Sequence, residues 1–244
     1  MLKPIIIAGY KKSGKTQLIE ELVQELRDRG YRVGTVKHVP GEDFTLDQSE
    51  TDTWKHAQAG ANPVIAVSPN EVAKIEKKSQ DLEEVLSRLD DLDFVLIEGF
   101  HKAEKIPKII ITQDEEEAEE LNDEFTIGFV GKGIEEKPIL NKNKINSIVD
   151  LIEEKAIPLV GGLNCGECGY DNCNEFVIAA INGEAPKNGC KPIQGPVKLK
   201  VDGKRIPLKS FVKGLIASSV SGMVSSLKGV EEGKIELEVE KDEG

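Results

Sequence analysis

Short apolar runs alternate with helical spacing along most of the chain. Apolar runs bounded by turn residues predict buried strands, and they occupy residues 5–8, 33–37, 63–67, 94–97, 108–112 and 126–130. Apolar residues at three- and four-residue spacing predict helices between these runs, and they fall within residues 18–26, 52–59, 82–89 and 145–152. Strands that alternate with helices predict an α/β domain with a mostly parallel sheet.

The pattern changes near Pro158. Residues 158–195 contain all four cysteines of the chain, with glycines and prolines around them. Beyond them, an Asp-Gly turn between two short stretches predicts a hairpin over residues 197–207. The helix predicted over 211–227 carries an apolar stripe that we interpret as internal core, and its small residues leave a dimer surface as the alternative. A last strand is predicted at 235–239.

The residues from Gly9 to Thr16 read G-Y-K-K-S-G-K-T, which fits the phosphate-binding pattern G-x-x-x-x-G-K-[ST]. A predicted strand precedes this loop and a predicted helix follows it, so backbone N–H groups and the helix N-terminus can face phosphates. We expect Lys15 to bind the outer phosphates and the Thr16 hydroxyl to bind Mg²⁺. The candidate nucleotide-binding residues are Gly9, Tyr10, Lys11, Lys12, Ser13, Gly14, Lys15, Thr16 and Gln17.

Two acidic residues are candidates for the opposite side of this site. Ligands of open α/β sheets bind beyond the carboxyl ends of the strands, and Glu98 follows the strand at 94–97 at that end. We expect Glu98 to face the phosphates directly or through Mg²⁺-bound water. Asp93 begins the same strand, roughly 16 Å away, so we discount it. Asp47, in the loop after the second strand, is the candidate second Mg²⁺ contact, with a surface acid as the alternative.

Lys15 and Glu98 are the candidate catalytic residues. Nucleotide hydrolysis needs an oriented water and stabilisation of charge on the transferring phosphoryl group. The sequence shows no pattern for an arginine finger, and Gln17 and Glu98 are uncompelling candidates to orient a water, so we expect slow turnover. The residues alone do not decide between GTP and ATP, because the stretch at 141–144 begins like a guanine-reading Asn-Lys-x-Asp motif but ends in Lys144.

The cysteines have the spacing C-x2-C-x4-C-x16-C, at Cys165, Cys168, Cys173 and Cys190. Four thiolates suit a 4Fe–4S cluster or a zinc ion. Structural zinc sites usually combine two pairs of ligands, each pair close together in the sequence. Here three cysteines lie close together and the fourth follows a helix predicted at 174–181. We therefore expect a 4Fe–4S cluster, with zinc as the alternative and disulfides last.

Composition and charge restrict the partners. The chain has 39% hydrophobic and 31% charged residues, which is typical of a globular protein with a sizeable core. Its net charge of −12 argues against a nucleic-acid partner, and the acidic run at 114–120 is interpreted as a solvated face. We find no secretory signal pattern and no apolar run of membrane-spanning length, so we expect a cytoplasmic protein without a membrane partner.

Residues 1 to about 155 resemble the molybdopterin-guanine dinucleotide biosynthesis adaptor family (MobB). The resemblance is carried by an ordered series: G-Y-K-K-S-G-K-T, T-V-K-H, Asp47 with T-D-T at 51–53, A-G-A at 59–61, and L-I-E-G-F followed by Pro107-Lys108. It implies binding of GTP with Mg²⁺, weak hydrolysis, a homodimer, and a molybdenum cofactor nucleotidyltransferase as partner, with a molybdoenzyme as a further candidate. Gln17 stands where related sequences often have a second threonine.

Residues from about 160 to 192 resemble the four-cysteine iron–sulfur domain of Rnf-type electron-transfer subunits and corrinoid iron–sulfur proteins. N-C-G-E-C-G-Y-D-N-C, A-A-I-N-G-E-A-P and Cys190 carry this resemblance, which implies a 4Fe–4S cluster of redox or structural role. We therefore divide the chain into a P-loop nucleotide-binding domain (1–156), a small iron–sulfur module (157–195) and a small α+β hairpin-helix-strand segment (196–244).

The leading functional hypothesis is a GTP-binding adaptor, at most a weak P-loop GTPase, in molybdenum or tungsten cofactor maturation. It would assist GMP attachment to molybdopterin. The first alternative is a nucleotide-gated electron-transfer or metallocentre-maturation ATPase, although Tyr10 stands where such ATPases often carry a signature lysine. The second alternative is a small-molecule kinase, for which we find no acceptor-binding signature.

Overall fold

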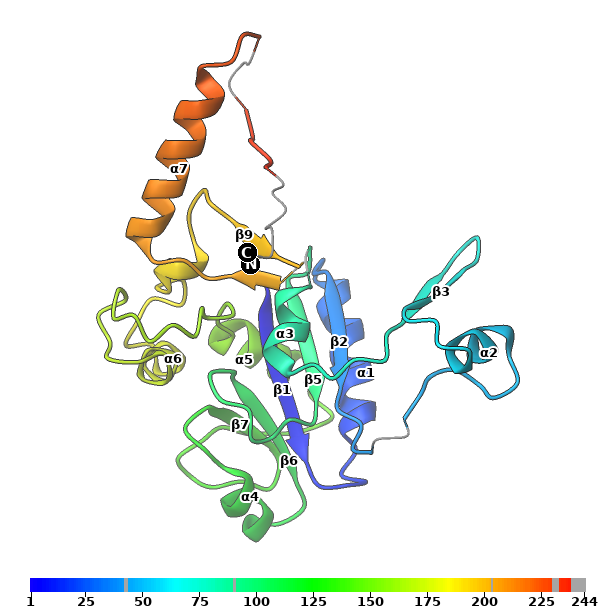
Figure 1. The fold of residues 1–244 in the computed structure, drawn as a ribbon. Coiled ribbons are helices and arrows are strands. Elements are labelled where there is room, and N and C mark those ends of the chain that lie inside the picture. The colour runs from blue at the N-terminus through cyan, green and yellow to red at the C-terminus, as the bar shows by residue number, and fades with distance from the viewer. Residues whose placement is uncertain (42–43, 90, 203, 230–232, 238–244) are drawn as a thin grey trace.

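A six-stranded parallel sheet forms the centre of the molecule (Figure 1). The computed structural model describes residues 1–41, 44–89, 91–202, 204–229 and 233–237. The strands follow the order β2-β5-β1-β6-β7-β8, and every neighbouring pair is parallel. Their bounds are β1 Lys3–Gly9, β2 Val33–Lys37, β5 Phe94–Glu98, β6 Lys108–Thr112, β7 Thr126–Gly131 and β8 Ile139–Leu140. The predicted α/β class is confirmed.

Two hydrophobic cores lie on opposite faces of this sheet, because the side chains of each strand alternate between the faces. The helices around the sheet are α1 Lys15–Asp28, α3 Leu82–Ser87, α4 Glu115–Leu121 and α5 Ile145–Lys155. Ile5 and Ile7 of β1 lie in one core with α1 and α5. Ile6 and Ala8 lie in the other core with α3 and α4. Since β1 is buried on both faces, its apolar run is continuous, which is why the sequence identified it.

An arm stands beside the sheet (Figure 1). It contains helix α2 Asp52–Gln58 and the antiparallel strands β3 Val64–Val67 and β4 Val72–Ile75. The strand predicted at 63–67 exists, but it does not join the main sheet, and β4 was not predicted. A local turn explains the pairing, because Ser68 N donates to Glu71 O at 2.8 Å. Ile65 and Val67 are exposed, so this apolar run does not mark a buried strand.

The cysteine-containing region packs on the same core as α1 and α5. Its helix α6 (Cys173–Asn182) contributes Phe176 to the buried cluster that holds Ile152 of α5. The chain enters this region beside the start of β1, where Leu159 N donates to Leu2 O at 3.0 Å. A short 3-10 helix, Lys191–Ile193, ends it. The division into residues 1–156, 157–195 and 196–244 stays a prediction.

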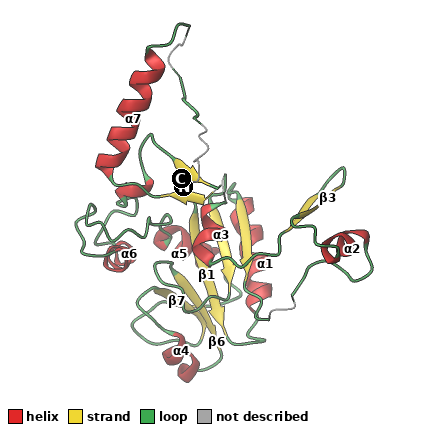
Figure 2. Cartoon of the chain, in the orientation of Figure 1, coloured by secondary structure: helices red, strands yellow, loops and turns green. Residues whose placement is uncertain are grey.

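The helix of the C-terminal segment extends away from the sheet (Figure 2). The predicted hairpin is present as β9 Leu199–Val201 and β10 Lys204–Ile206, followed by α7 Ser210–Ser225. Our interpretation of the α7 stripe as internal core is wrong, because Phe211, Leu215 and Met223 are exposed. Helical spacing shows which residues share a face, but not whether another element covers that face. Residues 235–237 are irregular, and the rest of the predicted last strand lies outside the described residues.

None of the helices in the described part of the chain combines the length and the apolar character needed for a membrane span.

Lys108 is a buried cation in β6, with a side chain that is 1% exposed. Its Nζ donates to Asp123 Oδ2 and, at 2.8 Å, to His101 O. Removing one partner of a buried ion pair leaves an uncompensated charge, so Asp123→Asn should lower the free energy of unfolding by about 2 kcal/mol. Lys108→Met removes the charge itself and should cost less. Urea denaturation measures both, and an equal or larger loss for Lys108→Met contradicts this account.

Candidate functional site

The predicted phosphate loop joins β1 to α1 at the carboxyl edge of the sheet, where its backbone adopts conformations that only glycine readily takes. Gly9 has φ +147°, and a Cβ on it would lie 2.6 Å from Ile111 O. Gly14 has φ +95° and is the N-cap of α1, with no side chain capping the helix. The first N–H groups of α1 are therefore available for an anion, as in known phosphate sites.

Lys15 folds back over its own loop. Its Nζ donates to Gly9 O at 2.9 Å and to Ser13 Oγ at 3.4 Å, and it also bonds to Tyr10 O. Burial lowers the pKa of the Lys15 ammonium below its usual value, while the carboxylate of Glu98 acts in the opposite direction. These weak carbonyl and hydroxyl acceptors hold a cation that has no direct ion pair in the described structure, so the ammonium is positioned to receive a stronger anionic partner.

Glu98 lies directly opposite Thr16. The Thr16 hydroxyl donates to the two carboxylate oxygens of Glu98 at 3.2 and 3.3 Å, and Lys37 Nζ lies 3.1 Å from the same carboxylate. The three residues come from α1, β5 and β2, whose ends meet at this edge. Lys37 ends the strand predicted at 33–37, but the sequence did not indicate its pairing with Glu98, because that pairing depends on which strand lies beside β5.

Asp93, which we discounted, lies at the opposite end of β5. It accepts a hydrogen bond from Arg32 N at 2.9 Å, and this bond holds the pKa of the Asp93 carboxyl below its usual value. Because Asp93 lies far from the phosphate loop and already bonds to Arg32, its exclusion from the phosphate site agrees with the structure.

Asp47 lies beside α2, in the arm. Its Oδ1 accepts from Thr51 Oγ1 at 2.8 Å and from Thr53 Oγ1 at 3.0 Å, while its Oδ2 is buried and has no hydrogen-bond partner in the described structure. No contact joins Asp47 to Thr16 or Glu98 among the described residues, and α2 stands apart from the phosphate loop (Figure 1). The structure therefore does not bring Asp47 to the other candidate Mg²⁺ ligands, and its role stays a prediction.

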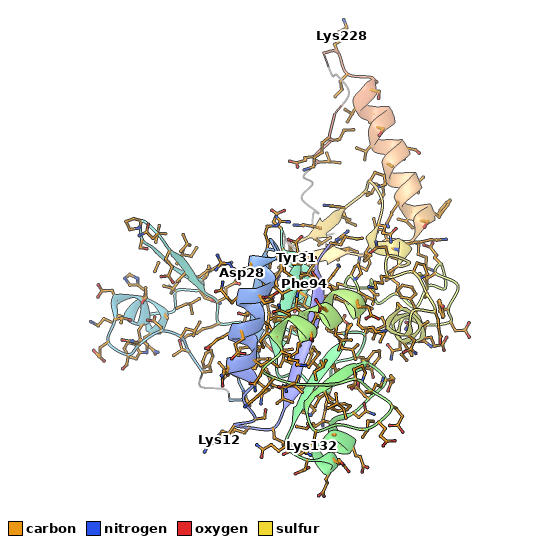
Figure 3. All side chains as sticks on the ribbon, turned by 180° about the vertical axis from the view of Figure 1, so that it is seen from behind. Lys12, Asp28, Tyr31, Phe94, Lys132 and Lys228 are labelled. Atoms are coloured by element: carbon orange, nitrogen blue, oxygen red, sulfur yellow. The ribbon has the colours of Figure 1, made fainter. Side chains whose placement is uncertain are left out.

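Both lysines and acidic residues lie near the other residues of the phosphate loop. Figure 3 shows Lys12 of the loop and Lys132, which follows β7, at the same end of the molecule. Tyr10 faces the acidic helix α4, and its hydrogen bond to Glu120 contributes most to raising its pKa to about 12. Lys11 is exposed. The acidic run was expected as a solvated face, and its proximity to the loop could be known only from the fold.

Gln17 turns along its own helix, because its Nε2 donates to Glu21 Oε1 at 3.0 Å. It therefore does not point toward Thr16 or Glu98 in this structure. Whether Gln17 can orient a water stays a prediction.

All four cysteines line one pocket, together with Gly161, Asn164 and Pro192. Cys165 and Cys168 lie on the loop before α6, Cys173 begins α6, and Cys190 precedes the 3-10 helix. No group of three or more His, Cys, Asp or Glu side chains in the described structure is arranged to hold a single metal ion. Two stretches of chain, residues 161–176 and 190–192, bring the cysteines together around one pocket.

Backbone N–H groups point at two of the sulfurs. Gly161 N donates to Cys190 Sγ at 3.3 Å, and Asn164 N donates to Cys173 Sγ at 3.4 Å. Burial raises the pKa of the Cys190 thiol, and N–H donors from Gly161 and Ile193 oppose this shift. Four thiols with N–H donors form a set that fits an iron–sulfur cluster. Asn164 was not predicted, although its place directly before Cys165 was a usable signal.

Comparison with known proteins assigns these two regions to two families. Residues 5–131 match the family model described as "Molybdopterin guanine dinucleotide synthesis protein B". Residues 162–192 match a second family model, described as "Putative Fe-S cluster". The first match includes the phosphate loop, Asp47 and Glu98, and the second includes all four cysteines.

Similar proteins agree with the first assignment. A "Putative molybdopterin-guanine dinucleotide biosynthesis adapter protein" of Methanocaldococcus jannaschii is 37% identical over 98% of this chain and 99% of its own length. The adapter protein of Haemophilus influenzae is 32% identical over 60% of this chain and 85% of its own. A crystal structure of molybdopterin-guanine biosynthesis protein B has TM-score 0.52 and 29% identity, covering 62% of this chain and 97% of that one.

Gly9 is the loop position at which the structure is least tolerant of a side chain. Gly9→Ala forces a Cβ against the backbone oxygen Ile111 O, which cannot rotate away, so it should lower the free energy of unfolding by about 2 kcal/mol or more. Gly30→Ala is the matched control, because Gly30 has φ +88° but open space around it, and it should cost about 1 kcal/mol. Urea denaturation compares them, and equal losses would show that the close approach to Ile111 is unimportant.

Proposed function

Because the chain belongs to the family of molybdopterin-guanine dinucleotide synthesis protein B, we propose that it is a GTP-binding adapter in molybdenum or tungsten cofactor maturation. In this role it assists a nucleotidyltransferase that attaches GMP to molybdopterin. The observation that carries the proposal is the meeting of Lys15, Thr16 and Glu98 at the carboxyl edge of the sheet, within the region that matches the family.

Each of these three residues has one task. Lys15 exchanges the carbonyl oxygens of its own loop for the outer phosphate oxygens, which are stronger acceptors for an ammonium. Thr16 would hold Mg²⁺ through the hydroxyl that now donates to Glu98, and the ion would supply positive charge beside the phosphates. Glu98 would face the ion across the site, while Lys37 keeps its carboxylate in place.

Turnover is slow in this proposal. Gln17 is engaged with Glu21, and the described contacts of Thr16 and Glu98 include no arginine. Stabilisation of charge on the transferring phosphoryl group is therefore left to Lys15 and Mg²⁺ unless a partner completes the site. The preference for guanine rests on the family and not on any contact in the structure.

The cysteine pocket holds a 4Fe–4S cluster in this proposal. Cys165, Cys168, Cys173 and Cys190 supply the four thiolates, and the N–H groups of Gly161 and Asn164 stabilise charge on the sulfurs. When bound, such a cluster supplies either a one-electron centre or a structural cross-link. We further propose that the protein acts in the cytoplasm as a homodimer, with the nucleotidyltransferase and a molybdoenzyme as partners.

Lys15→Ala should weaken binding of Mg-GTP at least tenfold, because it removes the cation that contacts the outer phosphates. Titration calorimetry with GTP and with ATP measures this, and the parent should prefer GTP. Lys78→Ala, at an exposed lysine of the arm segment, is the control and should bind as the parent does. If Lys15→Ala binds Mg-GTP as tightly as the parent does, or if the parent does not prefer GTP to ATP, the proposed GTP binding is wrong.

Anaerobic purification should yield about four iron and four sulfide ions per chain, because four thiolates suit a cubane cluster. Cys168→Ala and Cys190→Ala should each lose most of the iron but still bind Mg-GTP, since both lie outside the phosphate site. Elemental analysis and visible absorption provide the measurement. If the analysis finds one zinc ion per chain and no sulfide, the pocket is a zinc site and the cluster proposal is wrong.

A further inference from the structure

The segment between β5 and β6, residues 99–107, is here called the crossing segment. Parallel strands need a connection that returns from the carboxyl edge to the amino edge of the sheet. The crossing segment makes this return without a helix, and it contains a turn in which Ala103 N donates to Phe100 O at 2.8 Å. It therefore begins at the proposed nucleotide site and ends near the opposite edge of the sheet.

The first end of the crossing segment is packed tightly against His38. Glu98 O accepts from His38 N at 2.9 Å. Gly99 has φ +95°, and a Cβ on it would lie 2.8 Å from His38 Cβ. Phe100 has φ +52°, which is unusual for a bulky residue, and its ring lies 4.5 Å from the His38 ring. His38 therefore contacts three consecutive residues, Glu98, Gly99 and Phe100.

The second end of the crossing segment reaches the cysteine pocket. Asn174 Nδ2 donates to Glu104 Oε2 at 2.9 Å, and Asn174 directly follows Cys173 in the first turn of α6. Lys105 Nζ lies 3.8 Å from the position that a Cβ on Gly162 would take, and Gly162 lines the pocket. Glu104 thus bonds to the residue that follows Cys173, and Lys105 lies close to Gly162 of the pocket lining.

The crossing segment is anchored near its first end. His101 O accepts from the buried Nζ of Lys108 at 2.8 Å. This bond ties the residue after Phe100 to the start of β6. Non-glycine residues held at positive φ are often found at switch regions, and Phe100 is such a residue.

We propose that the crossing segment couples the nucleotide site to the iron–sulfur cluster, with Glu104 and Asn174 as the positioning residues that carry the coupling. The proposal rests on the function proposed above. When the Thr16 hydroxyl leaves Glu98 for Mg²⁺, the carboxylate and the backbone that follows it rearrange, and the Glu104–Asn174 hydrogen bond transmits the change to the turn that carries Cys173.

Coupling of this kind is reciprocal. If bound nucleotide changes the reduction potential of the cluster, then the redox state of the cluster must change the affinity for nucleotide by the corresponding factor. We expect the affinities of the oxidised and reduced forms for Mg-GTP to differ by about fivefold or more, at the lower end of typical allosteric coupling. A purely structural role for Glu104 and Asn174 would not produce this dependence.

The test uses the full-length protein with its cluster, prepared anaerobically. The midpoint potential and the electron paramagnetic resonance spectrum of the reduced cluster are recorded with and without a non-hydrolysable Mg-GTP analogue. The parent should show a shift of the potential on addition of the analogue. Glu104→Ala and Asn174→Ala should each abolish most of the shift, and the double variant should lose no more than either single variant.

The control variants change an asparagine and a glutamate that do not take part in the Glu104–Asn174 hydrogen bond. Asn182→Ala alters the other end of α6, and Glu136→Ala alters an exposed carboxylate after β7. Both should retain the shift. Iron content and affinity for the analogue in the absence of the cluster are measured for every variant, and both should equal those of the parent for Glu104→Ala and Asn174→Ala.

Three outcomes would overturn the proposal, and they are distinguishable. If the parent binds the analogue and holds its cluster but shows no shift, the coupling is absent while the proposed function stands. If the shift persists in both Glu104→Ala and Asn174→Ala, the crossing segment does not carry it. If the parent binds no nucleotide or holds no iron, the proposed function fails, and the coupling fails with it.

Discussion

The register between β5 and its two parallel neighbours is the constraint on which the candidate nucleotide site depends. Glu98 is paired with Ile7 of β1 on one side and with Lys37 of β2 on the other. Because β1 leads directly into the phosphate loop, this register brings the Glu98 carboxylate opposite the first turn of α1. A displacement of one residue would turn the Glu98 side chain to the other face of the sheet. Backbone pairing thus determines the chemistry of the edge.

The polar groups of this edge satisfy one another in the absence of a ligand. Lys15 bonds the carbonyl groups of its loop, and Thr16 shares Glu98 with Lys37. Buried and partly buried polar groups need partners, so this arrangement stabilises the loop before a nucleotide arrives. In the proposed function, nucleotide binding would exchange these internal partners for phosphate and Mg²⁺. That exchange is the change at Glu98 on which the proposed coupling through the crossing segment rests.

The cysteine pocket depends on the sheet for its own order. Helix α6 buries Phe176 in the core that also contains α1 and α5, and Leu159 in the segment that enters this region bonds to Leu2. A region this short cannot bury its apolar residues by itself, and burial against a large neighbouring core offsets the entropy of ordering it. This packing also places Asn174 within reach of Glu104, which lies between β5 and β6.

The sequence by itself determined five strands of the central sheet, the phosphate loop, the position of Glu98 at a carboxyl end and the close spacing of the cysteines, because each follows from local periodicity or close spacing; the short strand β8 was not predicted. Only the tertiary structure decided that residues 64–67 form a hairpin in the arm, that α7 is uncovered, and that Asp47 lies away from Thr16. It alone also brought Lys37 to Glu98 and Glu104 to Asn174. Contacts between distant residues depend on which elements pack together, and a short apolar run or a lone charged residue does not specify its partner.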